Sequence, residues 1–208
     1  MADPFDAAAV QSLLKAGDAR AAVELINQWL EHEPHNVDSL YHLAVAYRYS
    51  DEHHHALETV KQLQALAPKF GRGHQEAGYI HLALRQPEQA LQAFNRAVVL
   101  NDSLLASWRT IIKLCVRPEH AELRKRALLQ SERLAVLPPA LLSVRNATAE
   151  GNLRKAEDIC RHFLRQNPTH VEAMRLLADL GVRSEVLDDA EFLLESALDL
   201  SLIHISEP

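Results

Sequence analysis

The chain has 208 residues, a formal net charge of -6 and 48% hydrophobic residues, with only 5% aromatic residues. This composition favours a helical protein rich in Ala and Leu over a sheet protein, which needs more β-branched and aromatic residues. The mild charge gives no bulk attraction to nucleic acid or to an anionic membrane. No apolar run approaches the ~20 residues of a membrane span, and the start is acidic where a signal peptide is basic. We therefore expect a cytoplasmic protein.

Alanines and prolines recur along the chain at a fixed interval. Pro34 and Pro68 are 34 residues apart, and each follows an alanine, Ala22 or Ala56, by 12 residues. Ala90 comes a further 34 residues after Ala56. A period of 34 with a mid-repeat alanine and a terminal proline resembles the signature of the tetratricopeptide repeat.

This resemblance implies an all-α fold in which antiparallel helix pairs stack into a right-handed superhelical solenoid, each pair stable only against its neighbours. The proline cannot continue a helix and so ends each second helix. The fourth repeat is irregular, because Arg124 takes the alanine position counted from Trp108; we expect a longer turn around RPEH there. The spacing predicts about six repeats, near residues 3–36, 37–70, 71–104, 105–136, 137–170 and 171–200.

Residue size along the repeats fits close helix packing. Small residues such as Ala44 and Gly78 allow the two helices of a pair to approach closely. Large residues such as Tyr47 and Phe94 are expected to fill the space between neighbouring pairs.

In this family the first helix of each repeat lines the concave face of the solenoid. At the corresponding positions the chain carries more basic than acidic residues, together with three tyrosines. Such a groove would attract an acidic or sulfated partner, or an acidic segment of the same polypeptide. The alternative is that these cations are merely solvated. The predicted groove residues are Arg48, Arg72, Arg109, Lys113, Arg117, Arg145, Arg175, Tyr41, Tyr49 and Tyr79, with Lys15 and Arg183 as further cations and Asp38, Glu172 and Asp179 as the acids.

The sequence contains few residue patterns that are typical of metal, phosphate or catalytic sites. The run His53–His55 offers three consecutive side chains, which point in different directions on a helix, and we place it in a solvated turn between paired helices. The run GRGH at 71–74 has too few glycines and no preceding strand for a phosphate loop, so we read it as an inter-repeat turn. Cys115 and Cys160 are expected in the core. We find no catalytic arrangement and expect no enzymatic activity, metal or cofactor in this chain.

The last third of the chain carries a more specific pattern. The stretches AEGNLRKAEDICRHFL, HVEAMRLLA and LDDAEFLLESAL closely resemble the amino-terminal region of bacterial tetratricopeptide repeat–sulfotransferase fusion proteins. This resemblance covers residues 137–200 well and the earlier repeats more loosely. It implies further repeats and a sulfotransferase domain that uses 3′-phosphoadenosine 5′-phosphosulfate, held by a loop resembling P-R-S-G-T. Nothing here matches that loop, so no catalytic or cofactor residue is carried over.

The tail, residues 201–208 (SLIHISEP), breaks the repeat and resembles a translated sequencing adaptor; the alternative is a divergent natural C-terminus. We expect the chain to be the non-catalytic front of a sulfotransferase, with its own missing domain as a partner. The second hypothesis is a free-standing adaptor that binds an acidic peptide in the basic groove. Neither uses nucleic acid or a membrane. An end at residue 200 would leave Leu193, Leu194 and Ala197 uncovered, which predicts self-association.

Overall fold

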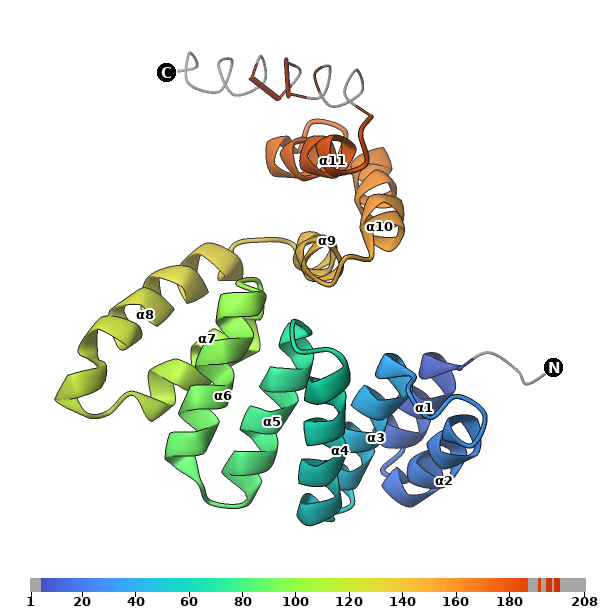
Figure 1. The fold of residues 1–208 in the computed structure, drawn as a ribbon. Coiled ribbons are helices and arrows are strands. Elements are labelled where there is room, and N and C mark those ends of the chain that lie inside the picture. Colours follow the sequence, from blue (N-terminus) through green and yellow to red (C-terminus); the bar gives the residue numbers. More distant parts are fainter. Residues whose placement is uncertain (1–4, 187–190, 192–193, 196, 199–208) are drawn as a thin grey trace. The chain divides into compact units, whose positions relative to one another are not determined.

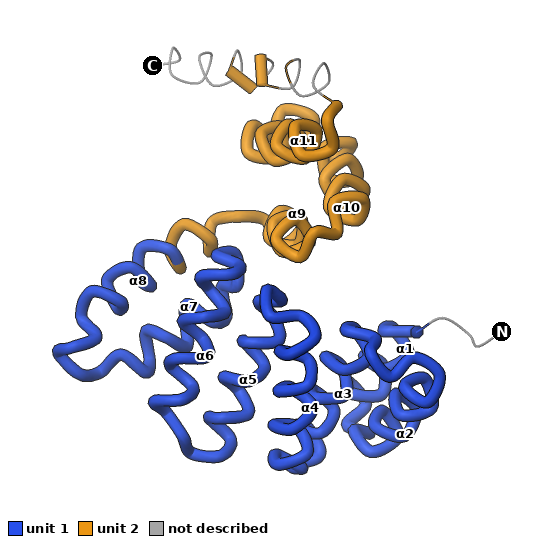
Figure 2. Tube along the Cα trace, in the orientation of Figure 1, with its two compact units in different colours: residues 1–130 blue, residues 131–208 orange. Residues whose placement is uncertain are grey.

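The computed structural model describes residues 5–186 together with 191, 194–195 and 197–198, and every regular element within them is helical (Figure 1). The all-α fold predicted from the sequence is confirmed. The chain divides into two compact units, residues 1–130 and 131–208 (Figure 2). The boundary lies inside α8 (Ala121–Ala135), the second helix of the irregular fourth repeat. None of the described helices is both long and apolar enough to cross a membrane.

Unit 1 is built from consecutive helix pairs. The first residues of α3, α5 and α7 follow one another at intervals of 34, which is the interval that the alanines and prolines set. Each of the first three pairs buries the small residue of its second helix, Ala22, Ala56 or Ala90, so the two helices approach closely. The pairs are α1 (Ala7–Lys15) with α2 (Ala19–Leu30), α3 (Val37–Tyr49) with α4 (His53–Leu66), α5 (Gly71–Ala83) with α6 (Pro87–Leu100), and α7 (Leu105–Leu114) with α8.

The turn within a pair repeats one backbone conformation. Gly17, Asp51 and Arg85, again 34 residues apart, all have positive φ, at 82°, 62° and 57°. The next residue donates its N–H to the carbonyl oxygen five residues back, as in the bond of 2.9 Å from Glu52 to Tyr47. This is the Schellman end of a helix, in which a left-handed residue reverses the chain and satisfies the last carbonyls. Gly151 and Glu185 form the same turn in unit 2.

The core of unit 1 alternates small and large side chains. Ala44, Ala56 and Ala90 are fully buried, as is the ring of Phe94. A Cβ on Gly78 would lie 2.8 Å from that ring, so the glycine is required by close approach of α5 to α6. Phe94 therefore fills space within its own pair, where the sequence had suggested space between pairs.

The fourth pair departs from the others at the end of its first helix. Here α7 has 10 residues, whereas α3 and α5 have 13 each. A 3-10 turn, η1 (Pro118–His120), stands between α7 and α8 in the place where the other pairs have the left-handed residue. Trp108 holds α7 in the core, fully buried, and donates its indole N–H to the carbonyl oxygen of Asp102 at 2.7 Å.

Unit 2 continues with α9 (Pro139–Ala149), α10 (Leu153–Gln166) and α11 (Val171–Arg183). Its core gathers apolar residues from all three helices, among them Leu141, Cys160 and Leu177. The Cys160 thiol donates to the carbonyl oxygen of Ala173 at 3.2 Å, and Cys115 is buried in unit 1. Both cysteines are thus in the core, as expected. The tail at 201–208 lies outside the described residues.

Candidate protein-interaction site

The first helices of the pairs form the inner layer of unit 1. Besides their contacts within pairs, α1 contacts α3 and α3 contacts α5, while contacts between the second helices α2, α4 and α6 are sparser among the described residues. A stack whose first helices lie closer together than its second helices curves toward the first ones. The predicted groove residues of unit 1 lie on α3, α5, α7 and the turn after α7.

Arg48 does not present a free charge to a partner. It forms a two-point ion pair with Glu76 of α5, through Nε to Oε1 and through Nη2 to Oε2, the latter at 3.4 Å. The side chains are 22% and 4% exposed. Burial raises the pKa of Glu76, while the hydrogen bond and charge of Arg48 act in the opposite direction. The predicted cation at this position is therefore neutralised by an acid that the sequence positions did not include.

Two of the predicted tyrosines lie beside this ion pair. The Arg48 guanidinium lies 4.7 Å from the centre of the Tyr49 ring and 5.3 Å from that of Tyr79. Tyr49 is 59% exposed, whereas burial raises the pKa of the half-buried Tyr79. The ring of Tyr79 also meets Phe94 edge to face at 5.0 Å. A fixed guanidinium between partly exposed rings makes a rigid, amphipathic surface.

Arg72 and Tyr41 form a second cluster on the same helices. The Arg72 guanidinium lies 4.9 Å from the Tyr41 ring and 5.2 Å from the Phe70 ring. Tyr41 meets both Phe70 and His42 edge to face. His42 is bound through Nδ1 to the carbonyl oxygen of Asp38 at 2.8 Å, and burial lowers its pKa. The structure thus joins the predicted groove residues of α3 and α5 through ring contacts.

At the α7 end the predicted cations differ in their partners. Arg109 and Lys113 are exposed, one helical turn apart, and form no ion pair with any described residue. Arg117, beyond the end of α7, pairs instead with Glu88 at 3.0 Å and with Glu119 at 3.7 Å. Of the predicted groove cations in unit 1, Arg109 and Lys113 on α7 and Lys15 at the end of α1 are exposed and have no acidic partner among the described residues.

The remaining predicted cations, Arg145, Arg175 and Arg183, lie in unit 2. Arg175 of α11 binds Glu172 through two hydrogen bonds of 2.9 Å each, and these raise its pKa. Arg183 binds Asp179 at 2.8 Å. Arg145 is half-buried on α9 and has interactions of its own.

Glu76 is the residue that sequence reasoning missed. It lies on α5 beside the buried Ala77, and its own side chain is buried as well. An acid at such a position requires a buried partner, and that requirement is the signal that could have paired it with Arg48. Gln75 was missed as well; its amide donates to Ser107 of α7 at 2.8 Å and links the two first helices.

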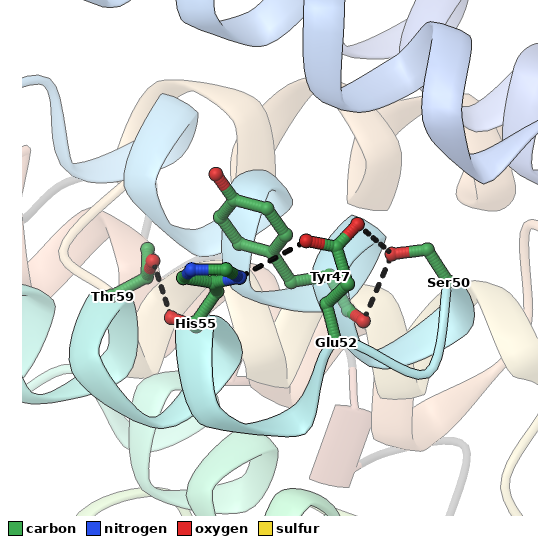
Figure 3. A network of polar contacts seen from close by, with 5 residues as sticks. All are labelled: Tyr47, Ser50, Glu52, His55 and Thr59. Carbon is green, nitrogen blue, oxygen red and sulfur yellow. Dashed lines mark hydrogen bonds and ion pairs between the residues drawn. The ribbon is translucent and has the colours of Figure 1, made fainter.

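The histidine run was placed wrongly by the sequence reading. His53 begins α4, and its neighbours belong to the first turn of that helix. His55 is bound through Nδ1 to the Glu52 carboxylate at 3.0 Å, its ring centre lies 5.3 Å from that of Tyr47, and Ser50 donates to Glu52 at 3.2 Å. Figure 3 shows these side chains gathered at the turn. These contacts close the turn between α3 and α4. Among the described residues, no three His, Cys, Asp or Glu side chains are grouped to hold a metal.

The run GRGH likewise lies in a helix, since Gly71 is the first residue of α5. A Cβ at Gly71 would lie 2.9 Å from the Cβ of Asn101. The glycine therefore allows the start of α5 to approach the end of α6, and the inter-repeat turn ends at Phe70, before this run begins.

Comparison with known proteins gives a family for part of the chain. Residues 7–69 match a family model described as tetratricopeptide repeat. The chain is similar to the structure of Naa15/Naa10 bound to HypK-THB, at 16% identity and a TM-score of 0.55, over 92% of this chain and 32% of that one. A human IFIT1 dimer with PPP-AAAA is 15% identical with a TM-score of 0.51, over 92% and 53%. The crystal structure of MamA is 15% identical with a TM-score of 0.47, over 99% and 100%.

A comparison with curated proteins gave no match. At these identities the first two structures support the fold and say nothing of function. Residues 7–69 are therefore tetratricopeptide repeats by sequence, and the described helix pairs of the chain have the tetratricopeptide repeat fold.

Proposed function

We propose that the chain is a cytoplasmic, non-catalytic scaffold whose inner layer in unit 1 binds a peptide segment of another protein. The observation that carries this proposal is the set of ring and guanidinium groups held at fixed positions along α3 and α5. Arg48 and Arg72 are each held against aromatic rings, and Tyr49 is largely exposed. Tyrosine and arginine in such arrangements contribute most of the affinity at many protein interfaces, because they bury area at low entropic cost.

The preference of this surface for an acidic peptide depends on two cations of α7. Because Arg48 and Arg117 have acidic partners, an acidic peptide would gain its charge interactions from Arg109 and Lys113. Exposed ion pairs contribute about 0.2–1 kcal/mol each. Removing both cations should therefore weaken binding by roughly 2- to 30-fold.

The test begins with peptides selected from a random display library on the immobilised full chain. Selected peptides are labelled and titrated against the wild type and against Arg109→Ala/Lys113→Ala at low and high salt. We expect weaker binding to the variant and a smaller salt dependence, because exposed charges are screened within ~10 Å at 0.1 M salt. Arg154→Ala/Lys155→Ala is the matched control, since these exposed cations lie on α10 of unit 2. Equal affinity for all three proteins would refute the acidic preference.

A second proposal is that the chain forms the non-catalytic, amino-terminal part of a sulfotransferase. The resemblance to the fusion proteins covers residues 137–200, and unit 2 begins close by, at residue 131. The resembling segment thus coincides with one compact unit of the fold, which supports treating it as a module. A long read of the source gene beyond codon 200 tests this proposal. Further repeats and a P-R-S-G-T-like loop would support it, and a stop codon directly after Pro208 would refute it.

A further inference from the structure

The fourth helix pair contains a hollow that the inner-layer surface does not use. Its volume is about 360 Å³, and it lies between the end of α7 and the first turns of α8. Five of its eight lining residues are apolar, three are cationic and none is acidic. The apolar lining includes Cys115, Val116 and Leu128, and the cations are Arg117, Arg124 and Lys125.

The hollow lies where α7 ends early, four residues before Pro118. Pro118 disfavours helical backbone at the residue before it, and Arg117 accordingly is extended, with φ -90° and ψ 150°. Helix α7 therefore ends at Leu114, three residues short of the length that α3 and α5 reach. The close backbone approach of the first three pairs is not repeated between α7 and α8 among the described residues. The missing turn leaves apolar side chains uncovered.

Two of the apolar side chains that line the hollow are exposed to solvent. Val116 is 82% exposed and Leu128 is 39% exposed. Both stand beside Arg124 and Lys125, which are exposed and form no ion pair with any described residue. Arg117 is the one cation of the hollow with acidic neighbours, Glu88 and Glu119. The net charge of the rim therefore stays positive.

We propose that this hollow is a second docking site, which takes an acidic peptide segment of a partner protein by one or two large apolar side chains. The apolar lining would cover Leu-type side chains, and Arg124 and Lys125 would pair with flanking carboxylates. The run LRKRA of α8, residues 123–127, thereby acquires a role. The site shares only Arg117 with the predicted groove, so the two surfaces can be separated by mutation.

The experiment uses a fluorescein-labelled peptide in which two Leu residues are flanked on each side by four Asp or Glu residues. Fluorescence anisotropy is measured with the full chain, and we expect saturable binding. Replacing both Leu residues of the peptide by Ser should weaken binding at least about tenfold, because the apolar contact is lost. A loss of similar size is expected for Leu128→Asp and for Arg124→Glu/Lys125→Glu.

The chain offers a closely matched control. Leu153-Arg154-Lys155 at the start of α10 repeats the Leu-Arg-Lys order of residues 123–125, and its cations are also exposed. Arg154→Glu/Lys155→Glu changes the net charge equally and should leave binding within about twofold of wild type.

Several results would overturn the proposal. They are absence of saturable binding at millimolar peptide, equal binding of the Leu and Ser peptides, and equal losses in the Arg124/Lys125 and Arg154/Lys155 variants. Preferential binding of a single-stranded oligonucleotide at Arg124 and Lys125 would assign the site to a different class of ligand and equally overturn it. Tryptophan fluorescence of each variant shows that unit 1 is folded, since Trp29 and Trp108 both belong to it.

Discussion

Replacing Arg48 by Ala tests how the inner layer of unit 1 is held together. The substitution leaves Glu76, whose side chain is 4% exposed, without its counter-charge. Breaking a buried ion pair from one side costs about 3–5 kcal/mol. Because Arg48 keeps 22% of its side chain exposed, water can partly replace it, and we expect a loss near the lower limit, about 3 kcal/mol.

The loss should depend on pH in a direction fixed by Glu76. Burial raises the pKa of this carboxyl, and without Arg48 no charge opposes the shift. An acid with a folded-state pKa above its unfolded value contributes stability below the unfolded pKa and loses it as pH rises through the folded pKa. The variant should therefore be closer to wild type at about pH 5 than at about pH 8.

Urea unfolding followed by tryptophan fluorescence is the appropriate assay. Trp29 and Trp108 are the only tryptophans, and both lie in unit 1. Arg48→Met/Glu76→Leu removes both charges and should recover most of the lost stability. Lys61→Ala, which breaks the exposed pair with Glu58 on α4 of unit 1, is the control for a surface contact. A loss below about 1 kcal/mol for Arg48→Ala, as at an exposed pair, or a loss that grows at low pH, would refute the reasoning.

Four further predictions concern the repeats and their packing. Gly78→Ala should destabilise unit 1 by about 1–3 kcal/mol, because its Cβ would overlap the Phe94 ring; an unchanged urea midpoint would contradict this. Arg85→Gly should raise stability by about 0.5–1 kcal/mol by relieving its φ of 57°, and a decrease would count against a strained turn. Burial raises the pKa of Cys160 to about 11, so this thiol should react with a disulfide reagent at neutral pH only after unfolding; rapid native labelling in Cys115→Ala would exclude the buried position. Leu194 and Leu198 are 47% and 60% exposed, and Leu194→Glu/Leu198→Glu should reduce any self-association seen by light scattering; equal mass for wild type and variant would remove these residues as its cause.

Residue spacing predicted the regular part of the fold because the repeat depends on local rules. A proline that ends a helix and an alanine that admits close approach act within one helix pair, so their interval is readable from the chain alone. The left-handed turn residues recur at the same interval. Asp51 and Arg85 nevertheless do not indicate a positive φ from their residue type, as a glycine would. The helical start at His53 was missed for a related reason, since histidine is not a usual first residue of a helix.

The charge of the candidate site could not be predicted in the same way. Spacing indicates that Arg48 and Arg72 lie on inner helices, but whether a cation is available depends on neighbours from other repeats. Glu76 comes from α5, in the repeat after Arg48, and Glu88 comes from α6, in the repeat before Arg117; these acids pair with the two cations. The hollow beside α7 was also beyond the repeat pattern, because it results from a departure at Pro118 rather than from the consensus.

Hydrogen exchange of the full chain with and without a display-selected peptide tests most directly whether the inner layer of unit 1 is the binding surface. We predict that bound peptide slows exchange in α3, α5 and α7, where the tyrosines, Arg72 and Arg109 lie. Protection confined to α2, α4 and α6, or to unit 2, would contradict the proposed function.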